Sequence, residues 1–142
     1  MSAGSSTAKM RLVVVVEDSG DCAETLQIAL ETMAGFEILV CLDDRDLWPI
    51  LERDFARVAA VITDLHLTQS DGFAVIRRLR GDARFEHIPV VLISGDSDPR
   101  LPEVALARGA SAWFPKPYSP AAVRRKLEEL VCEDEVCEDE VC

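Results

Sequence analysis

The sequence predicts an α/β protein with a doubly wound, five-stranded parallel sheet and helices on both of its faces. Short apolar runs such as Val58–Ile62 have the length and β-branched composition of strands that are buried on both faces. Segments with apolar residues at helical spacing alternate with these runs, and the connections are short. Parallel strands need crossover connections, and right-handed crossovers place helices on both faces. The order of the strands does not follow from this periodicity.

The first half of the chain contains two strand–helix pairs. The strand Leu12–Val16 precedes a helix that is capped at Ser19 or Asp21 and stopped by Gly35. The strand Phe36–Cys41 precedes a helix that opens at Asp43 and Asp44. Pro49 inside this second helical pattern predicts a helix that is short or begins late.

The second half contains three further pairs. Val58–Ile62 leads to Asp64, a polar loop at 68–72 and a helix that ends in Arg77, Arg78 and Arg80, interpreted as a solvated basic helix end. Ile88–Ser94 is the fourth strand, and the helix from Asp98 to Gly109 should be short because Pro102 lies in its first turn. Ala110–Phe114 is the fifth strand, followed by a helix from Ser119-Pro120 to Val131.

Length and composition indicate one globular domain. The chain has 142 residues, with 49% hydrophobic and 29% charged residues. We expect a flexible N-terminal segment at 1–9, a domain at 10–131 and an acidic tail at 132–142. No apolar run is long enough to span a bilayer and the N-terminus lacks a secretory signal, so we expect a cytoplasmic protein. The net charge of −11 argues against direct binding to nucleic acid.

The tail repeats Val-Cys-Glu-Asp-Glu with a period of five residues, which matches neither a helical stripe nor one face of a strand. We predict that it is disordered, with a fraying continuation of the last helix as the alternative. Its three cysteines are too widely spaced for a structural zinc site and lack a fourth ligand. Cys22 and Cys41 lie in apolar patterns and are predicted to be buried thiols, so no disulfide framework is expected.

Polar residues follow the strands at the points where the strands end. Glu17 and Asp18 follow the first strand, Asp64 the third, Ser94 ends the fourth and Lys116 follows the fifth. The carboxyl ends of parallel strands share one edge of a sheet, so these side chains should converge. Neighbouring carboxylates repel one another unless a cation neutralises them, and Mg²⁺ prefers oxygen ligands. A carboxylate nucleophile with a metal ion, a lysine and a hydroxyl forms a phosphoryl-transfer site.

This set of residues resembles the receiver domain of bacterial two-component response regulators, in particular chemotaxis regulators. The resemblance rests on Glu17-Asp18, on Asp64 followed by Asp71-Gly72-Phe73, on Ser94, and on Gly109-Ala110 leading to Lys116-Pro117. It covers about residues 10 to 131 and implies the flavodoxin-like fold of these receivers. No single one of these motifs is specific to the family, but five motifs in this order at the expected strand ends are specific.

The resemblance implies a role for each residue. Asp64 would accept a phosphoryl group from a histidine kinase or a histidine phosphotransfer protein. Asp18, Asp64 and the backbone carbonyl of His66 would bind Mg²⁺, with Glu17 acting through a water molecule. Lys116 would contact the acyl phosphate, and its bond to Pro117 is expected to be cis. Ser94 would move to the phosphoryl oxygen, and Trp113 stands at the position of the aromatic switch residue.

Three features depart from or vary the pattern of the family. Thr68 replaces the usual proline four residues after the phosphoacceptor, which predicts a looser loop. Trp113 is larger than the usual tyrosine or phenylalanine and needs more room to turn inward, which predicts a muted switch. His66 and Asp96 stand where family members tune dephosphorylation, and we hypothesise that they pair across the mouth of the site and hinder water.

The predicted function is therefore a phosphorylation-dependent switch rather than an enzyme acting on other substrates. Its downstream protein partner would bind the face of the fourth helix, fifth strand and fifth helix, and a homodimer remains open. A degenerate receiver that binds partners without phosphate is the alternative. An aspartyl-phosphate phosphatase is a weaker one, because His66 stands where a second acid is needed and the chain has no length for a cap domain. A free-standing receiver, a phosphorelay shuttle and a fragment of a longer regulator or hybrid kinase are all compatible with this sequence.

Overall fold

The computed structural model describes the backbone of residues 10–141 and the side chains of residues 10–131. The strands are β1 (Arg11–Val16), β2 (Phe36–Cys41), β3 (Val58–Asp64), β4 (Val90–Ser94) and β5 (Ala112–Pro115). The α-helices are α2 (Gly20–Leu30), α3 (Leu47–Arg53), α4 (Gly72–Arg80), α5 (Leu101–Ala107) and α6 (Pro120–Val141). Two short 3-10 helices, η1 (Asp44–Asp46) and η2 (Phe55–Arg57), flank α3. Every predicted strand and helix is present.

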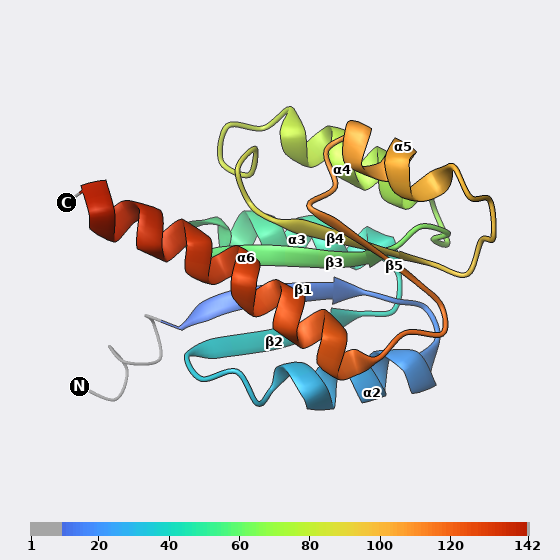
Figure 1. Cartoon of the computed structure of the whole chain (residues 1–142), viewed down its shortest axis with the longest axis horizontal. Coiled ribbons are helices and arrows are strands. Elements are labelled where there is room, and N and C mark those ends of the chain that lie inside the picture. Colours follow the sequence, from blue (N-terminus) through green and yellow to red (C-terminus); the bar gives the residue numbers. More distant parts are fainter. Residues whose placement is uncertain (1–9, 142) are drawn as a thin grey trace.

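The five strands form one parallel sheet in the order β2-β1-β3-β4-β5. The chain runs from β1 outward to β2 and then crosses back to β3 on the other side of β1, as Figure 1 shows. The strand order therefore reverses between β1 and β3, and in sheets of this kind ligands bind beyond the carboxyl ends of the strands at that point. The predicted fold class is confirmed.

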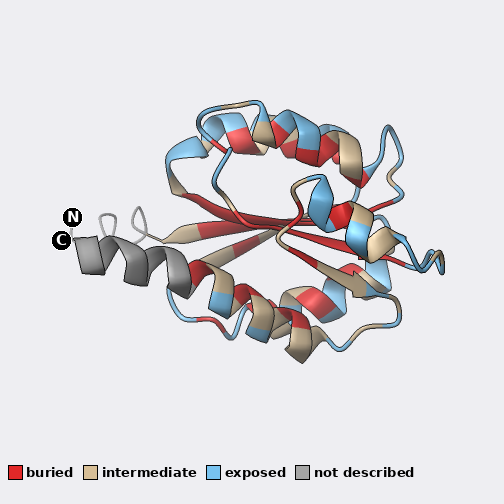
Figure 2. Ribbon diagram, turned by 45° about the horizontal axis from the view of Figure 1, so that its top comes forward, coloured by how far each residue is buried: buried red, intermediate tan, exposed pale blue. Residues whose placement is uncertain are grey.

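Helices cover both faces of the sheet and create two hydrophobic cores (Figure 1). On one face, α3, α4 and α5 bury residues that include Leu51, Ile76 and Ala105. On the other face, α2 and α6 bury residues that include Leu26 and Leu127. Buried residues lie along the strands and on the sides of the helices that face the sheet (Figure 2). The continuous apolar runs of the sequence are strands whose alternate residues enter opposite cores.

The two helices that contain proline early in their patterns are both short. The helix α3 has seven residues and carries Pro49 in its first turn. The helix α5 also has seven residues, with Pro102 in its first turn. Proline lacks an N–H group and is tolerated in the first turn of a helix, where that group has no partner within the helix. Both expectations of a short helix are confirmed.

The basic end of α4 is solvated at Arg77 and Arg78, as predicted, but not at Arg80. Arg80 is half-buried, and its Nη1 donates to the carbonyls of Phe85, Glu86 and Ile88 at 3.4, 3.2 and 2.8 Å. Its Nε and Nη2 donate to the carbonyl of Gly109 at 3.1 and 2.7 Å. Gly109 has a φ of 110°, and a Cβ there would lie 3.3 Å from Arg80 Cγ. Arg80 therefore joins the turns that precede β4 and β5.

The C-terminal helix continues through the acidic repeat. The helix α6 ends at Val141 instead of near Val131, so its backbone follows the alternative of a continued helix rather than disorder. The side chains of the repeat, including its three cysteines, lie outside the described residues, and the division into a domain and a tail at residue 132 stays a prediction. Within the described part of the chain, no helix is both long and apolar enough to cross a membrane.

The two cysteines of the described domain are both free thiols. Cys41 is buried, as predicted, and burial raises its pKa to about 11. Cys22 is only half-buried, because it lies on the side of α2 that borders a surface cavity rather than the core. The prediction of a buried thiol is therefore correct for Cys41 and wrong for Cys22.

Candidate functional site

The ends of four strands bring the predicted site residues to one edge of the sheet. Glu17 and Asp18 follow β1, and Asp64 is the last residue of β3. Ser94 is the last residue of β4, and Lys116 directly follows β5. The register pairs Asp64 with Ile93 and Ser94 with Pro115, so the three last strands end almost level. The convergence expected from the sequence is observed.

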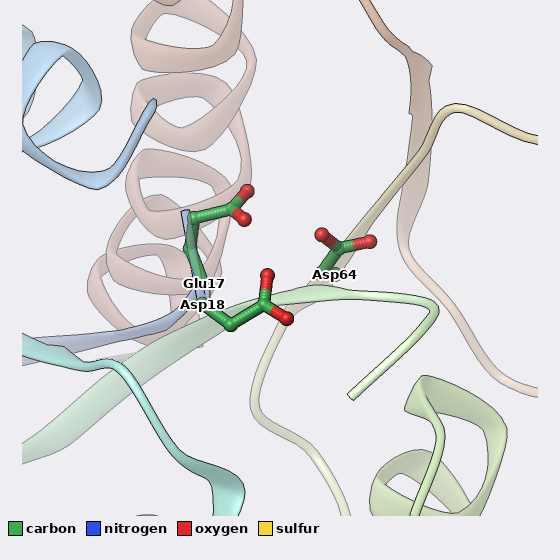
Figure 3. Close-up of side chains that lie close together, drawn as sticks. All are labelled: Glu17, Asp18 and Asp64. Atoms are coloured by element: carbon green, nitrogen blue, oxygen red, sulfur yellow. The ribbon is translucent and has the colours of Figure 1, made fainter. Parts of the chain in front are cut away.

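Three carboxylates converge between the ends of β1 and β3, where the strand order reverses (Figure 3). One oxygen atom each from Glu17, Asp18 and Asp64 lies within 4.8 Å of the others. Glu17 is 2% and Asp64 6% exposed, whereas Asp18 is exposed to solvent. Two acids are thus held in the protein interior and a third faces them from the surface.

Lys116 is the cation that faces the two buried acids. Its Nζ lies 2.7 Å from Asp64 Oδ2 and 3.1 Å from Glu17 Oε1. The Lys116 N–H donates to the Ser94 carbonyl at 2.8 Å, and the Lys116–Pro117 peptide bond is cis, as expected. Burial by itself lowers the pKa of Lys116, but hydrogen bonds and charges from Asp64 and Glu17 outweigh it and raise that pKa. The lysine is therefore positively charged.

One lysine does not balance this set of acids. Burial raises the pKa of Glu17, while the backbone N–H of Ser19 and the Lys116 ammonium oppose that rise. Glu17 Oε1 is buried and, although it lies near the ammonium, it has no hydrogen-bond partner. An unsatisfied buried oxygen beside two further carboxylates matches the ligand preference of a hard divalent cation. The residues present therefore fit Mg²⁺.

The backbone around Asp64 depends on a glycine in the following helix. The Gly72 N–H donates to the Leu65 carbonyl at 2.7 Å. A Cβ on Gly72 would lie 2.9 Å from the carbonyl oxygen of Asp64 and 2.5 Å from Leu92 Cδ1. Only a residue without a side chain allows α4 to approach the end of β3 so closely. Asp71 caps α4 by accepting from the Ala74 N–H at 2.8 Å, which explains the Asp71-Gly72 pair.

The hydroxyl of Ser94 is buried and already holds a hydrogen bond. Its Oγ accepts from the backbone N–H of Asp96 at 2.9 Å. Asp96 Oδ1 in turn accepts from the Asp98 N–H at 3.1 Å, and Asp98 Oδ1 accepts from the Arg100 N–H at 3.0 Å. Arg100 is the residue before α5. A chain of side-chain-to-backbone hydrogen bonds thus runs from the site to the start of α5.

Trp113 and the pair His66–Asp96 lie around this site. Trp113 is half-buried in β5, pairs with Leu92 and packs against the core beneath α3, α4 and α5. His66 Nε2 lies 3.7 Å from Asp96 Oδ2, and the two side chains are 71% and 40% exposed. These two residues do face each other, at a distance longer than a hydrogen bond.

Sequence reasoning missed one buried acid near the site. Asp44 is 3% exposed and accepts hydrogen bonds from Gln69 and Ser70, in the loop that follows Asp64. We interpreted Asp43-Asp44 only as the opening of a helix. Because a helix cap needs only one acid, the second acid of the pair was the one signal in the sequence that pointed to another role. The loop that Thr68 led us to expect as looser is therefore held by a distant carboxylate.

A surface cavity of about 460 Å³ lies beside the lysine. Asp21, Cys22 and Thr25 of α2 line one side of it, and Lys116 and Tyr118 are among the residues on the other. Burial raises the pKa of Tyr118 to about 12, so its phenol stays neutral. The cavity gives access to the lysine side of the site.

Comparison with known proteins agrees with this geometry. A family model described as the response regulator receiver domain matches residues 13–128. The chemotaxis protein CheY1 of Helicobacter pylori is 25% identical over 116 residues, which cover 82% of this chain and 93% of that protein. The structure of the chemotaxis response regulator CheY4 of Vibrio cholerae has a TM-score of 0.74 at 23% identity, covering 85% of this chain and 98% of that one.

A receiver from a different context is similar as well. The signal receiver domain of a signal transduction histidine kinase from Syntrophus aciditrophicus is 28% identical, with a TM-score of 0.74. The alignment covers 87% of this chain and 91% of that domain. The family match extends from β1 into α6 and includes the ends of all five strands. This chain therefore belongs to the response regulator receiver domain family of two-component signal transduction.

Proposed function

We propose that this receiver accepts a phosphoryl group on Asp64, in a reaction that depends on Mg²⁺, and thereby switches a protein-binding surface. The observation that carries the proposal is the environment of the Asp64 carboxylate. It is buried at the end of β3, lies 2.7 Å from the Lys116 ammonium and faces Glu17 and Asp18 within 4.8 Å. The Lys116 ammonium would offset the negative charge on the attacking carboxylate and on the phosphoryl oxygens.

In the proposed step, an Asp64 oxygen attacks the phosphorus of a phosphohistidine on a histidine kinase or a histidine phosphotransfer protein. The new P–O bond forms while the P–N bond breaks, and the imidazole keeps the electron pair of that bond. Lys116 stays within reach of the phosphoryl oxygens and offsets their charge. The cavity bordered by α2 offers the donor a route to the lysine side of the site.

Asp18, Asp64 and the backbone carbonyl of His66 would hold Mg²⁺, with Glu17 acting through a water molecule. When bound, the ion supplies positive charge for the phosphoryl oxygens in transfer and hydrolysis. The unsatisfied Oε1 of Glu17 supports this assignment, because it is a buried acceptor that would take the hydrogen bond of such a water. The His66 N–H donates to Asp64 Oδ1 at 3.4 Å, so the His66 backbone borders the acid.

The switch would begin at Ser94. A phosphoryl oxygen on Asp64 draws the Ser94 hydroxyl away from the Asp96 N–H and so breaks the first hydrogen bond of the chain that leads to α5. Trp113 in the neighbouring strand would follow as the aromatic switch. The face of α5, β5 and α6 would then bind a downstream protein, and Leu106 of α5, which is 54% exposed, supplies apolar surface there.

We further propose that His66 and Asp96 set the lifetime of the phosphoryl group, since both flank the path of an attacking water. The domain would catalyse only its own phosphorylation and dephosphorylation, in the cytoplasm and without direct nucleic-acid contact. A phosphatase with a broader substrate range has less support, because the side chain two residues after Asp64 is an exposed imidazole rather than a second acid.

Intact-protein mass spectrometry after incubation with acetyl phosphate and Mg²⁺ tests the proposal. We expect the parent protein and an Asp82→Asn control, changed at a half-buried acid beyond the C-terminal end of α4, to gain one phosphoryl mass. Asp64→Asn, which keeps the shape of the side chain, should gain none. Labelling of Asp64→Asn to the parent level contradicts the assignment. Absence of labelling in the parent from both acetyl phosphate and a phosphorylated histidine phosphotransfer protein favours a phosphate-independent binding module.

A further inference from the structure

A buried carboxylate from a separate part of the chain holds the loop between β3 and α4. Asp44, the first residue of η1, is 3% exposed. Its Oδ1 accepts from the backbone N–H of Gln69 at 2.9 Å, and its Oδ2 accepts from the hydroxyl of Ser70 at 2.9 Å. Both oxygens of one side chain therefore bond to adjacent residues that lie 25 and 26 positions further along the chain.

This role is distinct from the capping of η1. The neighbouring Asp43 accepts from the Arg45 N–H at 2.8 Å and pairs with the Arg45 guanidinium at 3.1 Å, which is a local cap at the surface. Asp44 makes neither of these contacts. Because a buried acid is costly unless it is bonded, its burial needs a reason beyond the helix end. The two hydrogen bonds to the loop provide that reason.

The loop has further contacts at its base, where His66 and Asp71 form an isolated bridge and Leu67 packs against the core. Within it, the Leu67 N–H donates to the Ser70 carbonyl at 3.3 Å, which is a long bond, and Thr68 does not restrict the backbone as a proline would. A cavity of about 290 Å³ lies between the loop and α3, lined by Trp48 and Arg78 as well as by Asp44 and the two loop residues that it binds. The hydrogen bonds from Asp44 therefore add to the packing of Leu67 and hold the loop at Gln69 and Ser70, where the cavity leaves it room to shift.

The same loop carries His66. We propose that Asp44 is a positioning residue, which fixes the 65–71 loop so that the His66 carbonyl and the Asp64 carboxylate are preorganised for a divalent cation. This inference rests on the proposed Mg²⁺-dependent phosphorylation of Asp64. In this proposal Asp44 acts through its hydrogen bonds to the loop and contacts neither the ion nor the phosphoryl group.

Two variants of Asp44 separate hydrogen bonding from charge. In Asp44→Asn, the amide oxygen still accepts from the Gln69 N–H, and the amide NH₂ donates to the Ser70 hydroxyl oxygen, which then acts as acceptor. This variant keeps both links without the negative charge. Asp44→Ala removes both links, and Ser70→Ala removes one of them.

The control is Arg80→Met. Arg80 links two turns at the opposite edge of the sheet through backbone carbonyls and touches none of the site residues. Its removal destabilises the fold without disturbing the loop after Asp64. A change in cation binding that merely follows a loss of stability would therefore also occur in Arg80→Met.

The experiment combines two readouts on the full chain. Amide NMR titration with Mg²⁺ measures its affinity, and amide hydrogen exchange of Gln69 without Mg²⁺ measures the order of the loop. In Asp44→Ala we expect Mg²⁺ affinity to fall about threefold to tenfold and Gln69 exchange to accelerate. Asp44→Asn should bind Mg²⁺ within about twofold of the parent, and Arg80→Met should match the parent.

The proposal is overturned if Asp44→Ala binds Mg²⁺ like the parent, if Arg80→Met loses as much affinity, or if Asp44→Asn is as weak as Asp44→Ala. Should Asp44→Ala not fold, Ser70→Ala decides the matter: we expect it to bind Mg²⁺ about threefold more weakly than the parent, and unchanged affinity overturns the proposal. Acetyl phosphate labelling of the parent is measured separately. A parent that binds Mg²⁺ but takes up no phosphoryl group contradicts the proposed function and leaves this comparison valid.

Discussion

The two edges of the sheet handle charge in opposite ways. At the carboxyl edge, Glu17, Asp18 and Asp64 gather around the single ammonium of Lys116, and the buried Glu17 Oε1 has no hydrogen bond. At the amino edge, the half-buried guanidinium groups of Arg57 and Arg80 have acceptors. Arg57 Nη1 lies 2.8 Å from Glu37 Oε1 and donates to the Met10 carbonyl at 3.2 Å. Arg80 bonds only to backbone carbonyls.

This contrast distinguishes residues that stabilise the fold from residues that form a binding site for a cation. Buried polar groups are normally satisfied, and Arg57 and Arg80 at the amino edge follow that rule. The carboxyl edge violates it at Glu17, where the surplus of acids provides a ligand set for a cation. Unsatisfied groups in native proteins cluster at functional sites for this reason. The predictions below test whether the two edges are as separate as this comparison implies.

The largest effect is expected for Lys116→Met. Its removal leaves Glu17 and Asp64 buried without a cationic partner, and we expect the free energy of unfolding to fall by about 2–4 kcal/mol in the absence of Mg²⁺. Phosphorylation by acetyl phosphate should also become undetectable. Urea unfolding and intact-mass analysis measure the two quantities. Normal labelling of Lys116→Met would show that the ion pair of Lys116 with Asp64 is not needed for phosphorylation.

Arg80→Met should be nearly as destabilising but functionally silent. The substitution leaves the carbonyls of Ile88 and Gly109, among others, without their donor, for an expected loss of about 2–3 kcal/mol. The rate of labelling with acetyl phosphate should stay within about twofold of the parent at a temperature where both proteins are folded. A loss of labelling without unfolding would show that the amino edge takes part in the chemistry.

The two edges should also differ in their response to pH. Burial raises the pKa of Glu17, so the folded state binds that proton more tightly than the unfolded state does. Charged Glu17 therefore lowers stability above its folded-state pKa, and this cost disappears as the pH falls toward the ordinary value of 4.5. Without Mg²⁺, Glu17→Gln should therefore be more stable than the parent at pH 7.5. The difference should shrink by pH 4.5.

Asp82 near the amino edge provides the control for that experiment. Its hydrogen bonds with Arg84 lower its pKa to about 2. The stability that it contributes is present above its ordinary pKa of 3.8 and is lost only as the pH falls toward 2. The difference in stability between Asp82→Asn and the parent should therefore be constant from pH 7.5 to 4.5. A Glu17→Gln difference that is equally constant would contradict the pKa shift of Glu17.

The smallest effect is expected at the rim of the carboxyl edge. His66 and Asp96 are both substantially exposed and lie 3.7 Å apart, which is a weak contact. We expect His66→Ala to shorten the phosphoryl lifetime by about twofold, because water reaches Asp64 more freely. The decay of the phosphorylated mass after removal of acetyl phosphate measures it. An unchanged lifetime would count against a role of this pair in hydrolysis.

Most of the site follows from local patterns. Asp64 is the last residue of one buried strand and Glu17 directly follows another, so their place at the sheet edge is set by their neighbours in sequence. Gly72 was also identified from the sequence, as part of the Asp71-Gly72 pair. Only the structure shows why a glycine is needed there, namely that a side chain would collide with the Asp64 carbonyl. Asp44 and Arg80 escaped prediction because their partners lie at least five positions away along the chain and are mostly backbone groups, which leave no pattern in the sequence.

Sequence alone determined the alternation of five strands and five helices, the short helices at Pro49 and Pro102, and the acids at strand ends. Each of these depends on residues within one turn or one strand, where apolar periodicity and proline act directly. The tertiary structure decided the strand order β2-β1-β3-β4-β5, the pairing of Lys116 with Glu17 and Asp64, and the link from Asp44 to the loop. These contacts join residues 25 to 99 positions apart, and only the packing of helices on both faces of the sheet brings such residues together.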